Sequence, residues 1–501
     1  PGNVSETITV TAETAMLQTD RSDTGRKLEA VQLVNMPLAF NRNFQSLLNL
    51  VPGTTRAFRP HSEFFNSQDS LSTQVNGMSR LANNVQFEGV DNNHRTGLLS
   101  VLIPPIEALE TVDVSTSNYE AELGRAGGAV TNIILRSGTN SLHGSVYYFH
   151  KDSALGARDT FLPSKPVTTY NYYGATIGGP IRKNKTFFFG DYLGVKDRRG
   201  DGYIITVPPS AFRTGDFSSV LGNGIVIYDP ATGNPNTGAG RTPFPNNRIP
   251  AERISGIAQR LLGLAPAPNL GTGISNNYSG ATTRSKDTES FDVKVDHQQN
   301  DRNRFSVRYS FQRPVVIDPP RFGIAGGGGK GFAATGTNRT QSAAVNYTRL
   351  FSASLIAEAR IGVSRYANIA ENTDIGANAS ETIGIRGANL DRWSSGLTQM
   401  SISGYADPLV GYSASLPWNR AETNIDFVNN WTKVLRNHTI KFGADLRRIR
   451  DELLQTQDNG GPRGIYRFRN NQTAIAGSCP IVQNRCGFSE LNTSESPGPS
   501  S

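Results

Sequence analysis

The chain has 501 residues, of which 37% are hydrophobic and 18% are charged, and it contains 51 glycines and 27 prolines. This composition disfavours both a helical bundle and a charge-driven disordered chain. The formal net charge is +8, but basic residues alternate with acidic ones instead of forming a stripe, so nucleic-acid binding is not expected. No stretch approaches the roughly 18 apolar residues of a transmembrane helix, whereas a transmembrane β-barrel needs apolar residues only at alternate positions.

The first 24 residues predict a flexible arm without a core of its own. Ile8, Val10 and Ala12 alternate there with threonines, as in an extended strand. No basic and hydrophobic leader follows Pro1, so we expect any targeting peptide to lie upstream of this sequence.

Residues 25–140 predict a small mixed α/β domain. Phe44, Leu47, Leu48 and Val51 have helical spacing, and the pattern stops at Pro52. Short strands are expected around 74–78, 84–92 and 129–137, with a helical turn in the segment 104–114.

A period of two dominates the chain beyond residue 140. The apolar residues Phe305, Val307, Tyr309 and Phe311 alternate with Arg304, Ser306, Arg308, Ser310 and Gln312. We therefore expect Val307 to face lipid and charge changes at Arg308 to be mild. A preceding run at 291–296 forms a hairpin with this strand. Similar runs predict strands at 143–150, 170–179, 186–197, 339–350, 353–366, 423–435 and 438–450, with a weaker tenth run at 463–469.

The connections between these strands alternate in length. Short turns are expected at 180–185, 298–303, 351–352 and 436–437, and long polar loops at 151–169, 198–287, 314–338 and 367–422. Membrane barrels have this alternation because the chain crosses the bilayer with every strand, whereas a soluble sandwich has no reason for it. The fold class predicted for residues 141–501 is therefore an antiparallel membrane β-barrel, with the mixed α/β domain before it.

Two loops carry further patterns. The loop 198–287 contains a predicted helix from Pro250 to Leu264. The run GIAGGGGKGF at 323–332 has Gly331 where a phosphate-binding loop needs Ser or Thr, so we interpret it as a mobile loop.

Cysteine and histidine spacing gives no cofactor or metal site. Cys479 and Cys486 suit either a small loop disulfide or two free thiols, and no second ligand pair completes a zinc site. The six histidines lack ligand spacing, and no nucleophile motif occurs, so an enzyme is not expected.

Several motifs together resemble TonB-dependent outer-membrane transporters. SETITVTAE resembles the TonB box of that family, and the segments PLAFNRNFQSLLNLVPG, VNGMSRLANNVQFEGVDNN and IEALETVDVSTSNYEAELGRAGGAVTNIILRSGTN resemble its plug domain. The loop phrase IYDPATGNPNTGAGRTPFPNNRIPAERISGIAQRLLGLAPAPN is similar to the Oar-like branch. The resemblance covers almost the whole chain and implies an outer-membrane protein of a Gram-negative bacterium.

In that family a plug domain fills the barrel, and a TonB-type protein in the periplasm pulls on it. The resemblance implies that the arm binds this partner by strand addition through Glu6, Thr7, Ile8, Thr9, Val10, Thr11 and Ala12. The function implied is active import of an extracellular substrate, such as an oligosaccharide or a peptide. An adhesin or surface-assembly protein on the same barrel and a secreted β-rich binding module are the alternatives.

By resemblance, substrate contact falls on outward loops of the plug domain. The candidate residues are Arg56, Arg59, His61, Phe65, Asn92, Asn93, His94 and Arg95. Arginine and asparagine can bond polar oligomers, and Phe65 can stack on a ring. The alternative is that these residues attach the plug domain to the barrel wall.

The strand count leads to an expectation about closure. Nine clear strands are fewer than half of the 22 in a plugged transporter barrel. We therefore expect this sequence to be incomplete and its structure to be an open, curved sheet partly wrapped around the plug domain.

Overall fold

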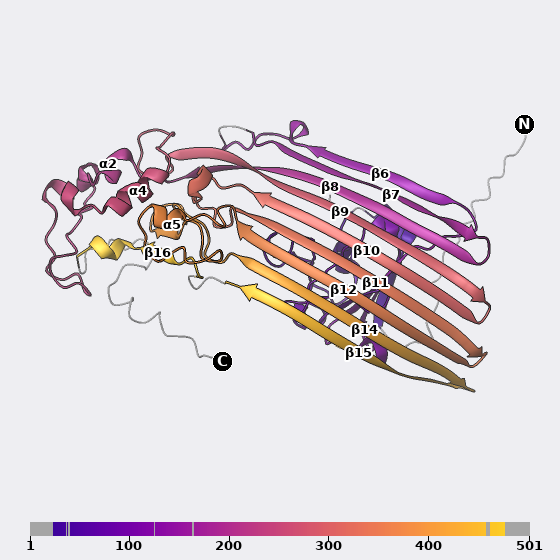
Figure 1. Ribbon diagram of the computed structural model, residues 1–501. Helices are drawn as coiled ribbons and strands as arrows, with labels where there is room; N and C mark the ends of the chain where they lie inside the picture. Colours follow the sequence, from indigo (N-terminus) through magenta and orange to yellow (C-terminus); the bar gives the residue numbers. More distant parts are fainter. Residues whose placement is uncertain are drawn as a thin grey trace, which may run out of the picture.

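The computed structural model describes residues 24–36, 38, 41–124, 126–162, 165–456 and 461–475. The predicted TonB box (6–12) and the cysteine pair (Cys479, Cys486) lie outside the described residues. The described chain forms a five-stranded sheet near the N-terminus, a nine-stranded sheet, and a two-stranded sheet among the loops. In Figure 1 the N-terminal strands, drawn in indigo, lie against one face of the nine-stranded sheet.

We call residues 24–135 the N-terminal unit. Its sheet has the order β1-β4-β5-β2-β3, in which only β2 and β5 are parallel. The strands are β1 (Thr24–Glu29), β2 (Asn84–Phe87), β3 (Val90–Asp91), β4 (Leu109–Ser117) and β5 (Val130–Leu135). The helical elements are α1 (Ala30–Asn35) and the 3₁₀ turns η1 (Phe44–Leu50), η2 (Arg80–Ala82), η3 (Ile106–Ala108) and η4 (Ala121–Leu123). Apolar side chains from these elements form one core.

The helix predicted from Phe44 onward is a 3₁₀ helix, η1. Its seven residues are too few for an α-helix to be stable by its own hydrogen bonds, so packing decides the local geometry. Phe44, Leu47 and Leu48 are buried as expected. Strand β1, by contrast, has no clear alternation in the sequence and was not predicted. Strand β4 was not predicted either, because it begins inside the segment 104–114 where a helical turn was expected. The strand expected at 74–78 is not among the strands of the described residues.

The nine-stranded sheet, here called the wall, confirms every clear strand of the sequence pattern. Each strand of the wall is antiparallel to its neighbours. The strands lie side by side in the same order as along the chain, β15-β14-β12-β11-β10-β9-β8-β7-β6. The strands are β6 (His143–Asp152), β7 (Thr168–Arg182), β8 (Thr186–Ile205), β9 (Tyr278–Asn300), β10 (Asn303–Asp318), β11 (Ala334–Ser352), β12 (Leu355–Asn372), β14 (Trp418–Leu435) and β15 (His438–Gln455). Most of these strands are longer than predicted. The residues at their outer ends pair with the neighbouring strand, but they do not alternate between apolar and polar types, so the sequence pattern missed them.

The outer face of the wall carries a row of apolar side chains in one register. The pairs run Leu446–Phe427, Phe427–Ile361, Ile361–Val345 and Val345–Val307 across five strands. Their exposed fractions range from 43% for Phe427 to 65% for Leu446. Near the short turns, aromatic rings stack in neighbouring pairs, such as Phe305 with Tyr347 at 4.6 Å. This is the apolar band with an aromatic girdle that a lipid-facing surface requires.

The inner face of the wall is polar, and on its middle strands it is largely buried because the N-terminal unit covers it; the edge strand β15 is exposed along nearly its whole length. Arg308 is 1% exposed and lies 3.9 Å from the centre of the Phe87 ring. The expectation that charge changes at Arg308 would be mild is therefore wrong. The period of two placed this side chain on the inner face but could not show that another part of the chain packs against it.

The long connections gather at one end of the wall, on the left in Figure 1, and the short turns lie at the other. The helical elements there are η5 (Ser153–Leu155), α2 (Ser210–Arg213), α3 (Ser218–Leu221), η6 (Pro245–Asn247), η7 (Ala251–Arg253), α4 (Gly256–Leu264), η8 (Gly323–Ala325), α5 (Ala379–Thr382) and η9 (Asn470–Thr473). None of the helices among the described residues is both long and apolar enough to cross a membrane.

Three loop predictions need correction. The helix expected over 250–264 is divided into η7 and α4, because Ile254 leaves the helical region. The weak tenth strand is β16 (Ile465–Phe468), which pairs in parallel with β13 (Gln399–Ile402) and not with the wall. The glycine-rich run is held by hydrogen bonds from the amides of Gly327, Gly328 and Gly329 to backbone carbonyls of residues 408–411.

The wall is open, as expected. Its edge strands in the described residues are β6 and β15, which do not pair with each other. The sheet therefore does not close into a small barrel.

Candidate functional site

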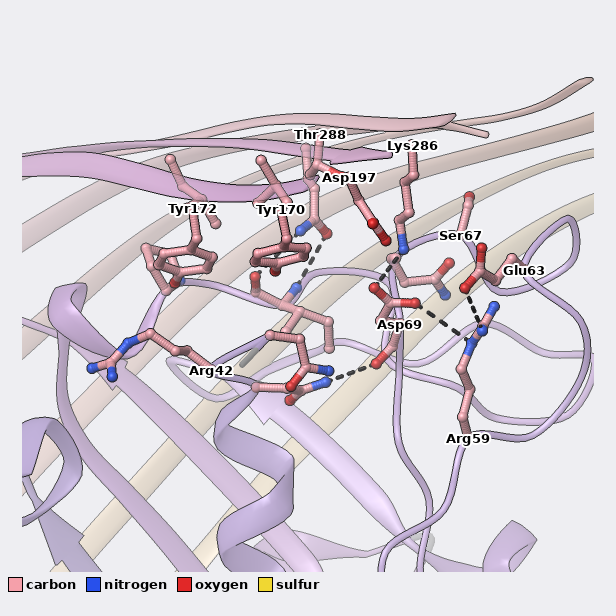
Figure 2. A pocket seen from close by; sticks show the side chains of 18 of the residues that line it. Arg42, Arg59, Glu63, Ser67, Asp69, Tyr170, Tyr172, Asp197, Lys286 and Thr288 are labelled. Carbon is pink, nitrogen blue, oxygen red and sulfur yellow. Dashed lines mark hydrogen bonds and ion pairs between the residues drawn. The ribbon is translucent and has the colours of Figure 1, made fainter. Parts of the chain in front are cut away.

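A cavity of about 280 Å³ lies between the N-terminal unit and the wall, toward the end with the long connections. One side is formed by the segments 41–43, 59–71 and 103–105 of the N-terminal unit. The other side is formed by inward residues of β7, β8, β9 and β10, among them Tyr170 and Tyr172 (Figure 2).

Seven charged side chains form a continuous ladder from β8 and β9 to the 59–69 loop, and all of them except Arg284 line this cavity. Acids and bases alternate in the order Arg199, Asp197, Arg284, Glu63, Arg59, Asp69 and Lys286. Figure 2 shows the part of this ladder around Arg59, Asp69 and Lys286.

The ladder links the N-terminal unit to two wall strands. Arg199 lies 3.0 Å and Arg284 3.1 Å from the Asp197 carboxylate. Arg284 also pairs with Glu63, and Lys286 with Asp69. Arg59 completes the chain, 2.8 Å from Glu63 and 3.5 Å from Asp69. Every carboxylate is thus shared between two cations.

Apolar and uncharged groups line the rest of the cavity. Leu193 and Val195 are buried beside Tyr172 on the wall, and Tyr170 packs against this cluster. The hydroxyl of Ser67 is buried and has no hydrogen-bond partner among the described residues. The cavity therefore offers both an apolar side and groups that can bond a polar ligand.

Closer to the short turns than the cavity, Glu88 of the N-terminal unit inserts between two cations of the wall. Its carboxylate lies 2.7 Å from Lys294 on β9 and 3.4 Å from Arg308 on β10. All three side chains are at most 7% exposed. Buried charges need such partners because their desolvation is costly.

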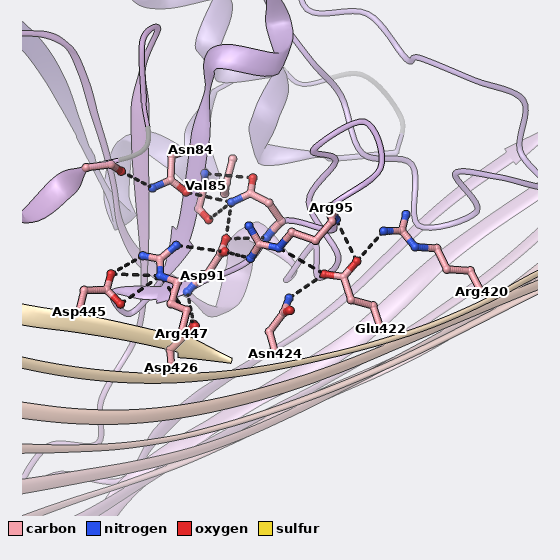
Figure 3. Close-up of polar contacts among 12 residues, drawn as sticks. Asn84, Val85, Asp91, Arg95, Arg420, Glu422, Asn424, Asp426, Asp445 and Arg447 are labelled. Atoms are coloured by element: carbon pink, nitrogen blue, oxygen red, sulfur yellow. Dashed lines mark hydrogen bonds and ion pairs between the residues drawn. The ribbon is translucent and has the colours of Figure 1, made fainter. Parts of the chain in front are cut away.

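A third group of polar contacts joins the N-terminal unit to β14 and β15 (Figure 3). The Asp91 carboxylate is fully buried between Arg95 and Arg447, and Arg447 lies 3.2 Å from it. The backbone amide of Asp91 donates to Asp426 at 3.3 Å. Arg95 also reaches Glu422, whose carboxylate accepts from the Arg95 amide at 2.9 Å.

His94 lies at the same contact. It is 4% exposed, its Nδ1 is 2.8 Å from Arg420, and its ring stacks on Tyr366 at 5.4 Å. Burial and the nearby Arg420 guanidinium hold the pKa of His94 well below its usual value of 6.5. The ring is therefore neutral near pH 7 and can accept a hydrogen bond from Arg420.

The eight predicted substrate residues have different environments, and only Arg59 lines the cavity. Arg95 and His94 bond to the wall, which agrees with the structural alternative. The ring of Phe65 packs between Phe332 and Trp418, at 5.8 Å and 5.0 Å.

Two of the eight residues stabilise the N-terminal unit itself. The Asn92 amide exchanges two hydrogen bonds with the backbone of Leu102. The Asn93 amide donates to Asn84 and to the carbonyl of Val85. Their side-chain amides form hydrogen bonds inside the protein, which argues against a role of Asn92 and Asn93 in ligand contact. Arg56 and His61 are exposed on the 54–72 loop, and their assignment stays a prediction.

Sequence reasoning missed most of the ladder. Glu63 and Asp69 lie within the predicted outward loop, and Asp197, Arg284 and Lys286 lie on wall strands. The alternation along each strand could have shown which charged side chains point inward. A charge on a covered face needs a partner, so these residues could have been predicted to form ion pairs. Which charges meet across the cavity depends on the docking of the N-terminal unit, which a pattern along the chain does not contain.

Residues 134–488 match the family model described as the outer membrane beta barrel domain. The chain belongs to this family. The match, the lipid-facing band and the fold together identify an outer-membrane β-barrel protein of a Gram-negative bacterium.

Among curated proteins, the chain is similar to the TonB-dependent transporter Oar of Myxococcus xanthus. The two are 30% identical over 159 residues, which cover 30% of this chain and 14% of Oar. Among solved structures, the outer membrane transporter YddB from Escherichia coli aligns with a TM-score of 0.52 and 10% identity, over 89% of this chain and 50% of YddB. The siderophore receptor PirA from Acinetobacter baumannii aligns with a TM-score of 0.47 and 11% identity, over 86% and 48% of the two chains. The chain thus spans half or less of the length of each of these three proteins.

Proposed function

We propose that this protein imports a substrate across the outer membrane, that the N-terminal unit is its plug, and that a TonB-type periplasmic protein supplies the energy through residues 6–12. Transport of this kind involves no covalent chemistry. The cavity beside the charge ladder is the proposed site of first substrate contact, with the long connections on the outside of the cell and the short turns in the periplasm.

The observation that carries the proposal is the chemistry of the contact between the N-terminal unit and the wall. At its centre and at β14 and β15 the two parts meet through ion pairs and hydrogen bonds, such as Glu88 with Lys294 and Asp91 with Arg447. Water can replace such partners when the unit moves, whereas exposing an apolar core of similar size has no compensation. A polar contact therefore suits a part that must move during import.

The proposed coupling uses strand addition by the arm. Main-chain hydrogen bonds join an added strand to a sheet edge, so the exact side chains matter less than the extended backbone. The arm precedes β1, which is an edge strand of the N-terminal unit and pairs with β4. A pull on the arm is therefore applied first to the edge of that sheet.

Uptake and surface binding measured together test the proposal. Ile8→Pro removes a backbone donor and fixes φ, so it should abolish energised uptake while binding of the same labelled substrate to cells remains. Thr9→Ser, which keeps the backbone unchanged, is the control and should transport normally. Wild-type uptake by the Ile8→Pro variant would contradict the assigned coupling. An adhesin would show binding but no uptake in any of the three proteins.

A further inference from the structure

The charge ladder along the cavity ends in a base on both sides. Its four bases are Arg199, Arg284, Arg59 and Lys286, and its three acids are Asp197, Glu63 and Asp69. One positive charge is therefore not balanced within the ladder.

Neighbouring charges do not remove this surplus. Arg42, which also lines the cavity, pairs with Glu107 at 2.7 Å. Asp318 acts on Arg284 electrostatically but is itself paired with Lys330. Both of these pairs are neutral, so neither of them offsets the surplus charge of the ladder.

The surplus is accessible at the Arg199 end. The Arg199 side chain is 57% exposed, whereas Lys286, at the opposite end, is 6% exposed. Among the described residues Arg199 forms an ion pair with one acid, Asp197, and shares it with Arg284, which lies directly opposite Arg199 on β9. Its guanidinium thus retains donors for a ligand at the mouth of the cavity.

We propose that this cavity binds one carboxylate of a small acidic substrate and that Arg199 receives it. This inference rests on the proposed function, whose substrate class it names. A carboxylate balances the surplus charge, and a guanidinium binds it with two parallel hydrogen bonds. Tyr170 and the buried Ser67 hydroxyl lie along the cavity for the uncharged part of the ligand. Since a volume of about 280 Å³ is at the lower end for ligand pockets, one small unit of a substrate fits there.

Acidic sugars and peptide termini both present such a carboxylate, so the test uses one matched pair of probes for each. The first pair is radiolabelled trigalacturonate and its methyl ester, and the second is N-acetyl-trialanine and its C-terminal amide. Equilibrium binding is measured on isolated outer membranes that contain the protein, with membranes that lack it as the blank. We expect the acid of one pair to bind more tightly than its neutral counterpart and to be weakened by salt.

Two variants with opposite effects locate the binding charge. Arg199→Gln should weaken binding of the acid by about tenfold, as expected for loss of a charged hydrogen-bond partner. Asp69→Asn should strengthen it severalfold, because it removes one of the three acids. Asn also suits the positive φ of 59° at this position. Arg198→Gln is the matched control, since it removes the same charge from the same strand on the opposite face, where Arg198 pairs with Asp287.

The outcomes separate this inference from the proposed function. Binding to isolated membranes needs no energy, so its failure would not bear on import, and a failure of import would leave binding unchanged. The inference is overturned if neutral probes bind as tightly as their acids, if neither acid binds, or if Arg198→Gln weakens binding as much as Arg199→Gln. If the Arg199 variant alone weakens binding of one acid, the inference holds and that acid identifies the source.

Discussion

The Lys294 ammonium on the wall lies 2.7 Å from the Glu88 carboxylate of the N-terminal unit, and both side chains are at most 7% exposed. Arg308 approaches the other oxygen of the same carboxylate at 3.4 Å. One buried acid therefore neutralises part of the charge of two cations. Removal of the acid and removal of one cation should have unequal consequences.

Glu88→Gln should destabilise the docked N-terminal unit by about 3 kcal/mol or more, because it leaves the buried Lys294 without its ion-pair acid and removes one of the two acids that act on Arg308. Lys294→Met should cost less, since Arg308 still faces the carboxylate. The measurement is the denaturant concentration at which residues 84–91 lose protection from hydrogen exchange. Equal shifts for the two variants would contradict the expectation that losing the shared acid costs more than losing one of its two cations.

Asp91→Asn should lower the force needed to extract the N-terminal unit, because Arg95 and Arg447 both lose their fully buried partner. Single-molecule pulling from the N-terminus of protein in a lipid bilayer measures this force. Glu110→Gln, at an exposed acid of the same unit, is the control and should leave the force unchanged. If the two variants give the same force, Asp91 does not fasten the unit to the wall.

The strands of the wall could be predicted from the sequence, whereas the contacts between its inner face and the N-terminal unit could not. Alternation of Phe305 and Val307 with polar residues fixes the strand and its two faces, since a β-strand has a period of two. The partner of an inward charge is set by residues far away along the chain. Arg308 and Glu88 are 220 positions apart by their residue numbers, and no local pattern connects them.

The candidate site was predicted in outline only. Part of the 54–72 loop, which was chosen for substrate contact, lines the cavity through residues such as Arg59. Its contact with a substrate stays a prediction. Asn92 and Asn93 were chosen for their polar amides, but those amides satisfy buried backbone groups of the N-terminal unit. Residue type alone does not distinguish these two uses, because both need the same donors and acceptors.

Val307→Arg should destabilise the wall by about 2–4 kcal/mol, because Val307 lies in the outward apolar row and would place a charge in lipid. Leu435→Arg is the matched control. Leu435 faces outward on β14 directly before the turn 436–437, near the membrane surface, where the cost is about 0–1 kcal/mol. Unfolding in lipid vesicles measures both, and equal costs would argue against the assigned membrane position.

Acidification should weaken the docking of the N-terminal unit through His94. Its pKa is lowered in the folded protein, so the unfolded chain takes up the proton first as the pH falls. The contribution of His94 to stability is complete above about pH 6.5 and falls below it, by about 1 kcal/mol for the first pH unit. His94→Gln keeps an acceptor for Arg420 but does not titrate. The difference in unfolding free energy between pH 7.5 and 5.5 should be smaller in this variant, and an equal difference would exclude His94 as its source.

Gly362 on β12 allows the N-terminal unit to approach the wall at Val90. A Cβ at position 362 would lie 2.5 Å and 2.7 Å from the two methyl groups of Val90, which is closer than real contacts permit. Gly362→Ala should therefore displace the unit and lower its protection from hydrogen exchange. Val90→Ala removes these methyl groups, so the double variant should recover much of the protection that Gly362→Ala loses.

Gly190→Ala is the control for this experiment, because its Cβ would meet its nearest neighbour at an ordinary 3.6 Å. It introduces the same methyl group into a wall strand without a clash. If Gly362→Ala were as mild as Gly190→Ala, the N-terminal unit would have room to shift at β12. The close contact between Val90 and the wall would then not determine the position of the N-terminal unit.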